Sequence, residues 1–196
     1  MSQRFTAALV LIFAGAALRL VSVGGFNFAP IGAIALFGGL MFRNRWLAFG
    51  TPLLATLLAD VALAIQNNND FGTYLLNPMM LFVYSSWALY VLCGIGVRRF
   101  WGERPSNTRR YMTAIGGSLI GSILFFVVSN LGVWATQPYY AKTLSGLSEC
   151  FVAAVPFFRN TPLSDLAYFS VIVTVMALVS RTVTDSREAS ALAMVD

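Results

Sequence analysis

The basic residues of this chain alternate with its hydrophobic stretches. Six such stretches lie at about residues 5–23, 28–42, 46–65, 76–97, 111–135 and 163–180. Ten of the thirteen basic residues precede the first stretch or follow the second, fourth and sixth: Arg4, Arg43, Arg45, Arg98, Arg99, Arg104, Arg109, Arg110, Arg181 and Arg187. Because cytoplasmic loops are enriched in Lys and Arg, this alternation predicts six membrane spans with both termini in the cytoplasm.

The composition supports a membrane location. Hydrophobic residues make up 58% of the chain and charged residues 11%, whereas soluble domains carry roughly 25% charged residues. The net charge of +5 would suggest nucleic acid in a soluble chain, but here the arginines lie at span ends, where anionic lipid headgroups attract them. We therefore expect an integral membrane protein that binds no nucleic acid.

The spans predict an all-α bundle of six transmembrane helices. A helix needs about 20 apolar residues to cross the ~30 Å hydrocarbon core, so the second stretch is short. A thin or tilted span is the preferred interpretation, since a re-entrant loop would leave Arg43 and Arg45 on the outer side. The fifth stretch carries small residues at helical spacing, which favour close packing within the chain: Ala114, Gly117, Ser118, Gly121 and Ser122.

The gap at residues 136–162 predicts an additional helix. Apolar residues recur there near helical spacing: Leu144, Leu147, Phe151, Val152, Val155 and Phe158. This pattern is typical of a short amphipathic helix, which we expect to lie over the outer face as a lid. Residues 1–181 then form one membrane domain, and residues 182–196 form a polar cytoplasmic tail that we expect to fray.

Polar residues of the spans concentrate in the predicted outer half. Such side chains are costly in a membrane, so they face the protein interior or a wet cavity. Together with aromatic residues on the same side, they have the make-up of a small-molecule site. The candidate ligand-binding residues are Arg19, Asn27, Asp60, Asn130, Trp134, Tyr139, Arg159 and Asp165.

These candidates have separate expected roles. Arg19 and Asp60 would orient polar groups of the ligand, the two asparagines and Asp165 would add hydrogen bonds, and Trp134 and Tyr139 would stack on it. The alternative is that Arg19 and Asp60 form a buried ion pair that only fixes helix packing.

Catalysis and cofactor binding find little support. The chain has no histidine, the commonest general base and metal ligand, and it lacks the phosphate-binding motif GxxxxGK[ST]. Cys93 and Cys150 belong to opposite ends of the predicted bundle, too far apart for a disulfide. We expect neither an enzyme nor a bound cofactor or metal.

Several segments resemble a bacterial family of uncharacterised six-helix membrane proteins. They are residues 27–39 (NFAPIGAIALFGG), 52–60, 129–134 (SNLGVW), 142–150 and 156–160, together with Asp165. That family in turn is similar to the S components, the substrate-binding subunits of energy-coupling factor (ECF) vitamin transporters. The resemblance implies six helices, an outward-facing vitamin pocket, and a partner complex of a scaffold protein and two ATPases.

Two departures from the S-component pattern stand out. S components often carry an Ala-x-x-x-Ala motif on the first helix, and residues 5–23 have no alanine pair at that spacing; Ala55 and Ala59 have it on the third span. A histidine commonly precedes the Asn-Phe-x-Pro motif, where this chain has Val23, Gly24 and Gly25. A solitary transporter therefore stays open beside the ATPase-coupled form.

The sequence thus predicts a membrane subunit or solitary transporter for uptake of a small vitamin-like solute. One alternative is a non-transport envelope scaffold or assembly protein whose outer polar cluster is structural. A further alternative is a proton-coupled carrier that uses Asp60 as its relay.

Overall fold

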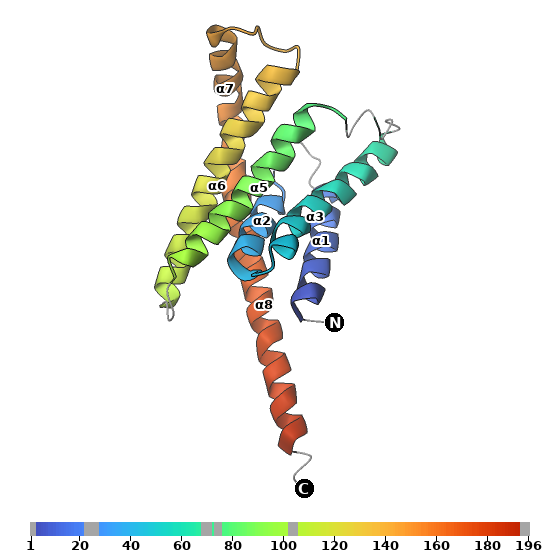
Figure 1. The fold of residues 1–196 in the computed structure, drawn as a ribbon, viewed down its shortest axis with the longest axis vertical. Helices are drawn as coiled ribbons and strands as arrows, with labels where there is room; N and C mark the ends of the chain where they lie inside the picture. The colour runs from blue at the N-terminus through green and yellow to red at the C-terminus, as the bar shows by residue number, and fades with distance from the viewer. Residues whose placement is uncertain (1–2, 22–27, 68–71, 73–75, 102–105, 193–196) are drawn as a thin grey trace.

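The computed structural model describes residues 3–21, 28–67, 72, 76–101 and 106–192, with side chains in the last helix as far as Met176. The described chain is helical, as predicted (Figure 1). Its helices are α1 (Gln3–Val21), α2 (Ile31–Met41), α3 (Arg45–Gln66), α5 (Met79–Arg99), α6 (Asn107–Thr136), α7 (Leu144–Phe158) and α8 (Asn160–Leu192).

Successive helices run in alternating directions. In Figure 1, α1, α3 and α6 run upward, whereas α2, α5 and α8 run downward, so α1 begins and α8 ends toward the same side. Within the residues that the structure describes, four helices are long and apolar enough to cross a membrane: α1, α3, α5 and α6. Their outward faces carry large apolar side chains such as Phe13 and Leu81, which are 63% and 74% exposed. The chain is built as an integral membrane protein.

The helix starts follow from local sequence. Asn44 caps α3 by accepting the Trp46 N–H at 2.9 Å, and Thr143 caps α7 by accepting the Gly146 N–H at 3.2 Å. Pro30 and Pro78 immediately precede α2 and α5, where the lack of an N–H costs the helix nothing. These residues explain where the helices begin, which the hydrophobic pattern alone predicts only to within a few residues.

Helix α2 forms the centre of the bundle. Every residue from Ile31 to Leu40 is buried, with α1, α3, α5, α6 and α8 packed around it. The sequence predicts a thin or tilted span here, but 11 residues rise only about 16 Å, roughly half of the ~30 Å core. Helix α2 by itself is therefore too short to cross, and its apolar surface on all sides reflects burial within the protein.

Glycines allow α2 and α5 to touch through their backbones. A Cβ added at Gly39 would lie 2.2 Å from the Val91 carbonyl oxygen and 2.9 Å from the Cα of Gly94. No side chain fits at that distance, so the crossing depends on both glycines. The small-residue stripe of α6 also packs within the chain, as predicted: Gly121 faces the Tyr90 ring, and Gly117 faces Val97 and Leu36.

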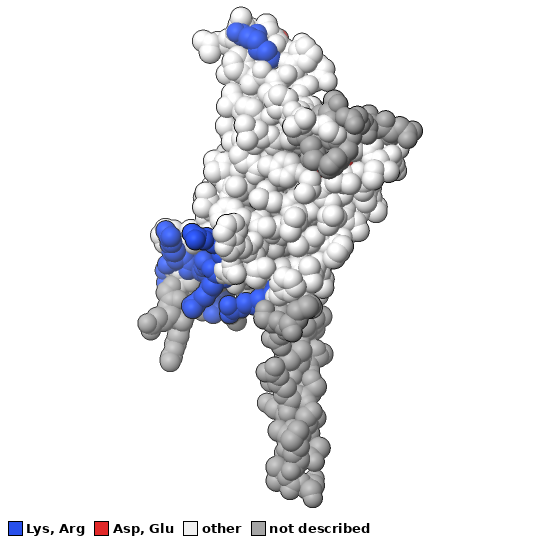
Figure 2. Space-filling view, turned by 45° about the vertical axis from the view of Figure 1, so that its right-hand side comes forward, with Lys and Arg blue, Asp and Glu red and all other residues white. Residues whose placement is uncertain are grey.

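Arginines gather at one end of the bundle (Figure 2). Arg98 Nη1 donates a hydrogen bond to the Phe42 carbonyl oxygen at 2.8 Å, which joins the end of α5 to the α2–α3 connection. The guanidinium groups of Arg45 and Arg110 lie over the rings of Trp46 and Trp101. The described arginines at this basic end belong to the gaps after the second and fourth hydrophobic stretches. This agrees with the predicted alternation of basic residues and spans.

Helix α7 has the predicted bounds but a different packing face. It lies alongside α6 and contacts α8 (Figure 1), instead of crossing the outer face of the bundle. Leu144, Val152 and Val155 are exposed, so they do not belong to its buried face. The less exposed residues follow helical spacing: Leu147, Cys150, Phe151, Ala154 and Phe158.

Helix α8 continues beyond its expected end. We predicted a span ending near residue 180 and a frayed tail at 182–196, but the helix extends to Leu192. The sequence there, Arg-Glu-Ala-Ser-Ala-Leu, contains mostly good helix formers, which explains the error.

Candidate ligand-binding site

The predicted polar residues fall into separate clusters, the first of which joins α1, α3 and α5. Arg19 Nη2 donates to Asp60 Oδ1 at 2.7 Å, and the Tyr84 hydroxyl donates to Asp60 Oδ2 at 3.1 Å. Asp60 is fully buried, and the Arg19 side chain is 21% exposed. Both oxygens of the carboxylate therefore have donors from the protein itself, and the ion pair anticipated as the structural alternative is present.

The second cluster surrounds Asp165 in the interior. Its Oδ2 accepts hydrogen bonds from the Tyr90 hydroxyl at 2.5 Å and the Ser122 hydroxyl at 2.8 Å. A Cβ added at Gly32 would lie 2.2 Å from Asp165 Oδ1, so the carboxylate fits against the bare backbone of α2. These four residues tie α2, α5, α6 and α8 together, and Asp165 is only 2% exposed.

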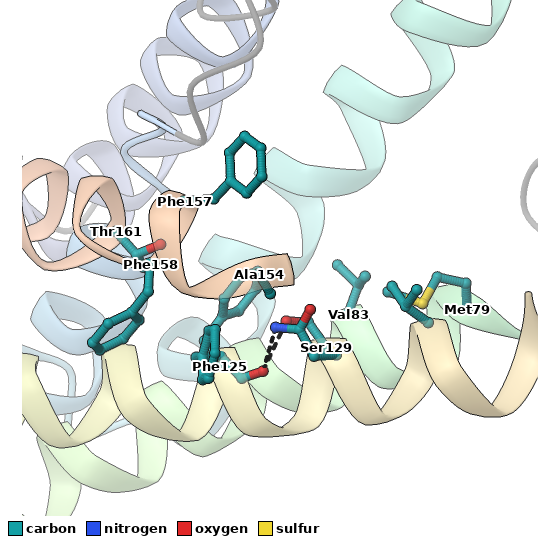
Figure 3. A pocket seen from close by; sticks show the side chains of 11 residues that line it. Met79, Val83, Phe125, Ser129, Ala154, Phe157, Phe158 and Thr161 are labelled. Carbon is teal, nitrogen blue, oxygen red and sulfur yellow. Dashed lines mark hydrogen bonds between the residues drawn. The ribbon is translucent and has the colours of Figure 1, made fainter. Parts of the chain in front are cut away.

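A pocket lies between α5, α6, α7 and the start of α8. Its volume is about 260 Å³. Met79 and Val83 of α5 form one wall and Phe125 of α6 forms the floor, while Ala154 and Phe158 of α7 cover it (Figure 3). We call this cavity the α7 pocket. Phe158 packs on Phe126 with ring centroids 4.9 Å apart, so α7 is held over the pocket by aromatic contact.

The polar groups of the α7 pocket come mainly from one turn of α6. Ser129 and Asn130 both line it, and Asn130 Nδ2 donates to the Phe126 carbonyl oxygen at 2.7 Å. No charged side chain is among the described lining residues. A ligand would therefore meet an apolar, aromatic wall with one polar edge.

Trp87 lies behind the pocket wall. Its ring stacks on Phe125 with centroids 4.5 Å apart, and its buried Nε1 has no acceptor among the described residues. An unpaired buried N–H costs about 1–3 kcal/mol.

The remaining candidates lie outside the α7 pocket. Trp134 Nε1 donates to the Ala141 carbonyl oxygen at 2.9 Å, and Lys142 Nζ donates to the carbonyl oxygens of Trp134 and Gln137. These bonds close the α6–α7 turn. Tyr139 is 73% exposed in that turn, Arg159 is exposed where α7 ends, and Asn27 lies outside the described residues.

The structure thus brings Arg19 and Asp60 together but places Asn130 and Asp165 at separate positions. Tyr90 and Ser122 were not among the predicted site residues, because a tyrosine in a span and a serine in a small-residue stripe both look like packing residues. Val83 and Phe125, which line the α7 pocket, were not predicted either. Among the described residues, no group of three His, Cys, Asp or Glu side chains is placed to hold a metal ion.

The fold defines the class as an α-helical membrane protein with a small, covered pocket. Within that class, the chain belongs to the family of unknown function DUF6580, which matches residues 1–189. No curated protein matches the chain. No solved structure matches it either.

Proposed function

We propose that this protein binds a small vitamin-like solute in the α7 pocket and takes part in its uptake, as a membrane subunit or as a solitary transporter. The α7 pocket carries this proposal, since it combines aromatic walls, a polar edge and a helical cover. Small-molecule sites are typically concave and mostly apolar, with a few polar groups that fix orientation.

The position of the pocket supports uptake from outside. It lies toward the end of the bundle opposite the arginines of α5 and α6. By the charge rule the basic end is cytoplasmic, so the α7 pocket would face the outer leaflet of the bacterial plasma membrane, with both termini inside. In this arrangement α8 is the last span, and α2 completes the six-helix bundle as a short central element.

The pocket lining favours an uncharged ligand with an aromatic or apolar body. Burying an ion without a partner is costly, and the described wall supplies no charged side chain. Asn130 and Ser129 are placed to orient a single polar edge. The volume of about 260 Å³ is slightly below the usual range of about 300–1,000 Å³, so a compact ring system fits better than an extended molecule.

The Arg19–Asp60 pair receives a structural role in this proposal. Its atoms bond to each other and to Tyr84, and neither residue lines the α7 pocket. In the half of the bundle that holds this pair, the polar cluster is therefore best explained as structural. A structural cluster is what the alternative of an envelope scaffold or assembly protein predicts.

Energised transport would require a partner. The resemblance to S components supports an ECF scaffold and ATPase subunits as that partner, while the missing Ala-x-x-x-Ala pair on α1 keeps a solitary transporter open. Affinity purification from the native membrane separates the forms, because the coupled form brings down ATPase subunits, whereas an assembly factor brings down envelope machinery.

A matched pair of variants tests the pocket. Ala154 lines it, while its neighbour Ala153 is exposed and does not line it. We expect Ala154→Phe to fill the pocket and Ala153→Phe to leave it open. Mass spectrometry of small molecules retained through purification should find a solute with the wild type and with Ala153→Phe, but not with Ala154→Phe. Equal retention by the three proteins would contradict the proposal.

A further inference from the structure

A second cavity opens at the basic end, between the end of α2, the start of α6 and the middle of α8. Its volume is about 430 Å³. Leu40 and Met41 of α2, Ala114 of α6, and Val173 and Met176 of α8 give it apolar walls. We call it the basic-end groove. Met41 is 48% exposed, so the groove borders the surface that membrane helices present to lipid.

One cation stands in this apolar lining. Arg110 lines the groove together with Trp101, and its guanidinium carbon is 5.7 Å from the centroid of the Trp101 ring. Trp101 Nε1 donates to Thr113 Oγ1 at 2.9 Å, and Thr113 is itself bonded to the Arg109 carbonyl oxygen at 2.7 Å. The tryptophan is therefore held in place as a platform for the arginine.

The surroundings of Arg110 are positive. Arg109 precedes it, and Arg98 and Arg99 end the neighbouring helix α5. The carboxylates whose side chains the structure describes lie elsewhere: Asp60 bonds to Arg19, Asp165 to Tyr90, and Glu149 to Ser145 on α7. These arginines would attract a ligand with a negatively charged headgroup, and no carboxylate with a described side chain offsets that attraction.

The lining distinguishes an acyl chain from a peptide. An extended peptide in the groove would bury backbone N–H and C=O groups, and each such group needs a partner. The groove offers mostly apolar walls, and its Trp101 N–H is already bonded to Thr113. An acyl chain needs no hydrogen bonds, and apolar side chains pack against it as lipid tails do.

We propose that the basic-end groove is a binding site for one anionic phospholipid. An acyl chain lies between α2, α6 and α8, and the phosphate bonds to Arg110. Arginine suits this position because its planar guanidinium binds phosphate oxygens in pairs and stacks on aromatic rings. The site is separate from the α7 pocket and does not depend on the uptake proposal.

Native mass spectrometry of the detergent-solubilised full chain tests the site with two probes, dioleoyl phosphatidylglycerol and dioleoyl phosphatidylcholine. Arg110→Gln removes the cation at the groove. Arg45→Gln is its matched control, because Arg45 also lies over a tryptophan at the basic end, 5.9 Å from the Trp46 ring, but does not line the groove. We expect one tightly held phosphatidylglycerol on the wild type and the control, and about fivefold weaker binding to Arg110→Gln.

A groove-filling variant tests the acyl chain. Ala114→Phe adds a ring where the α6 wall is 3% exposed, and Val173→Phe fills the groove from α8 if the first variant does not fold. Either folded variant should lose the tightly held lipid. The proposal is overturned if Arg110→Gln binds phosphatidylglycerol like the wild type, if phosphatidylcholine binds equally well, or if a filled groove still holds the lipid.

Discussion

The backbone contact between α2 and α5 gives a stability prediction for Gly39→Ala. The new methyl carbon would lie 2.2 Å from the Val91 carbonyl oxygen, roughly 1.3 Å inside the optimal ~3.5 Å separation. The atoms that it meets are backbone atoms of two buried helices, so no side-chain rotation relieves the overlap. Overpacking of this kind costs about 1–3 kcal/mol, and the higher helix propensity of alanine returns about 0.5–1 kcal/mol.

The expected net loss is about 1 kcal/mol. For a chain of this length that lowers the midpoint of thermal unfolding by about 2–4 °C, measured by intrinsic tryptophan fluorescence in detergent micelles. Gly50→Ala is the matched control, because its Cβ would meet no atom within 4 Å; we expect it to raise the midpoint by about 1–4 °C. If both variants melted at or above the wild-type temperature, the close α2–α5 crossing would be wrong.

Three further predictions concern the two polar clusters and the Cys150 thiol of α7. A double-mutant cycle with Arg19→Gln and Asp60→Asn should give a coupling energy above about 1 kcal/mol in thermal unfolding, more than exposed pairs show, because Asp60 is fully buried; a coupling near zero would contradict the pairing. Tyr90→Phe removes a donor from the buried Asp165 carboxylate and should cost about 1–3 kcal/mol of stability, a loss absent if the hydroxyl does not bond there. Burial raises the pKa of the Cys150 thiol above its ordinary value. Maleimide labelling at pH 8, with the other cysteine changed to alanine, should therefore stay slow until the protein unfolds. Rapid labelling of the folded protein would show that α7 does not bury this thiol.

The sequence predicted the helices better than their arrangement. Charge alternation and hydrophobic length located α1, α3, α5 and α6, and the apolar spacing located α7. Helix α2 was misjudged because apolar residues on every side suit both a lipid-facing span and a helix enclosed by protein. The density of small residues near Gly38 and Gly39 was the signal for enclosure, since lipid does not require such close approach.

The candidate site was predictable only in part. Depth in the membrane placed Arg19 and Asp60 at the same level, and the ion pair that they form was the alternative to the predicted ligand-binding role. The depth of a residue in the membrane, as predicted from the sequence, does not show which neighbouring helix its side chain faces. For that reason it did not show that Asn130 would line a pocket while Asp165 joined a buried network, and the contributions of α5 became apparent only from the packing.

The most direct test of the uptake proposal is equilibrium binding of the retained solute to purified Asn130→Ala and Asp60→Asn. Asn130 lines the α7 pocket, so losing its hydrogen bond should weaken binding about fivefold to tenfold. Asp60 lies in the separate ion pair, so Asp60→Asn, once shown to be folded, should bind like the wild type. Weakened binding by Asp60→Asn together with unchanged binding by Asn130→Ala would contradict the account and place the ligand at the ion pair.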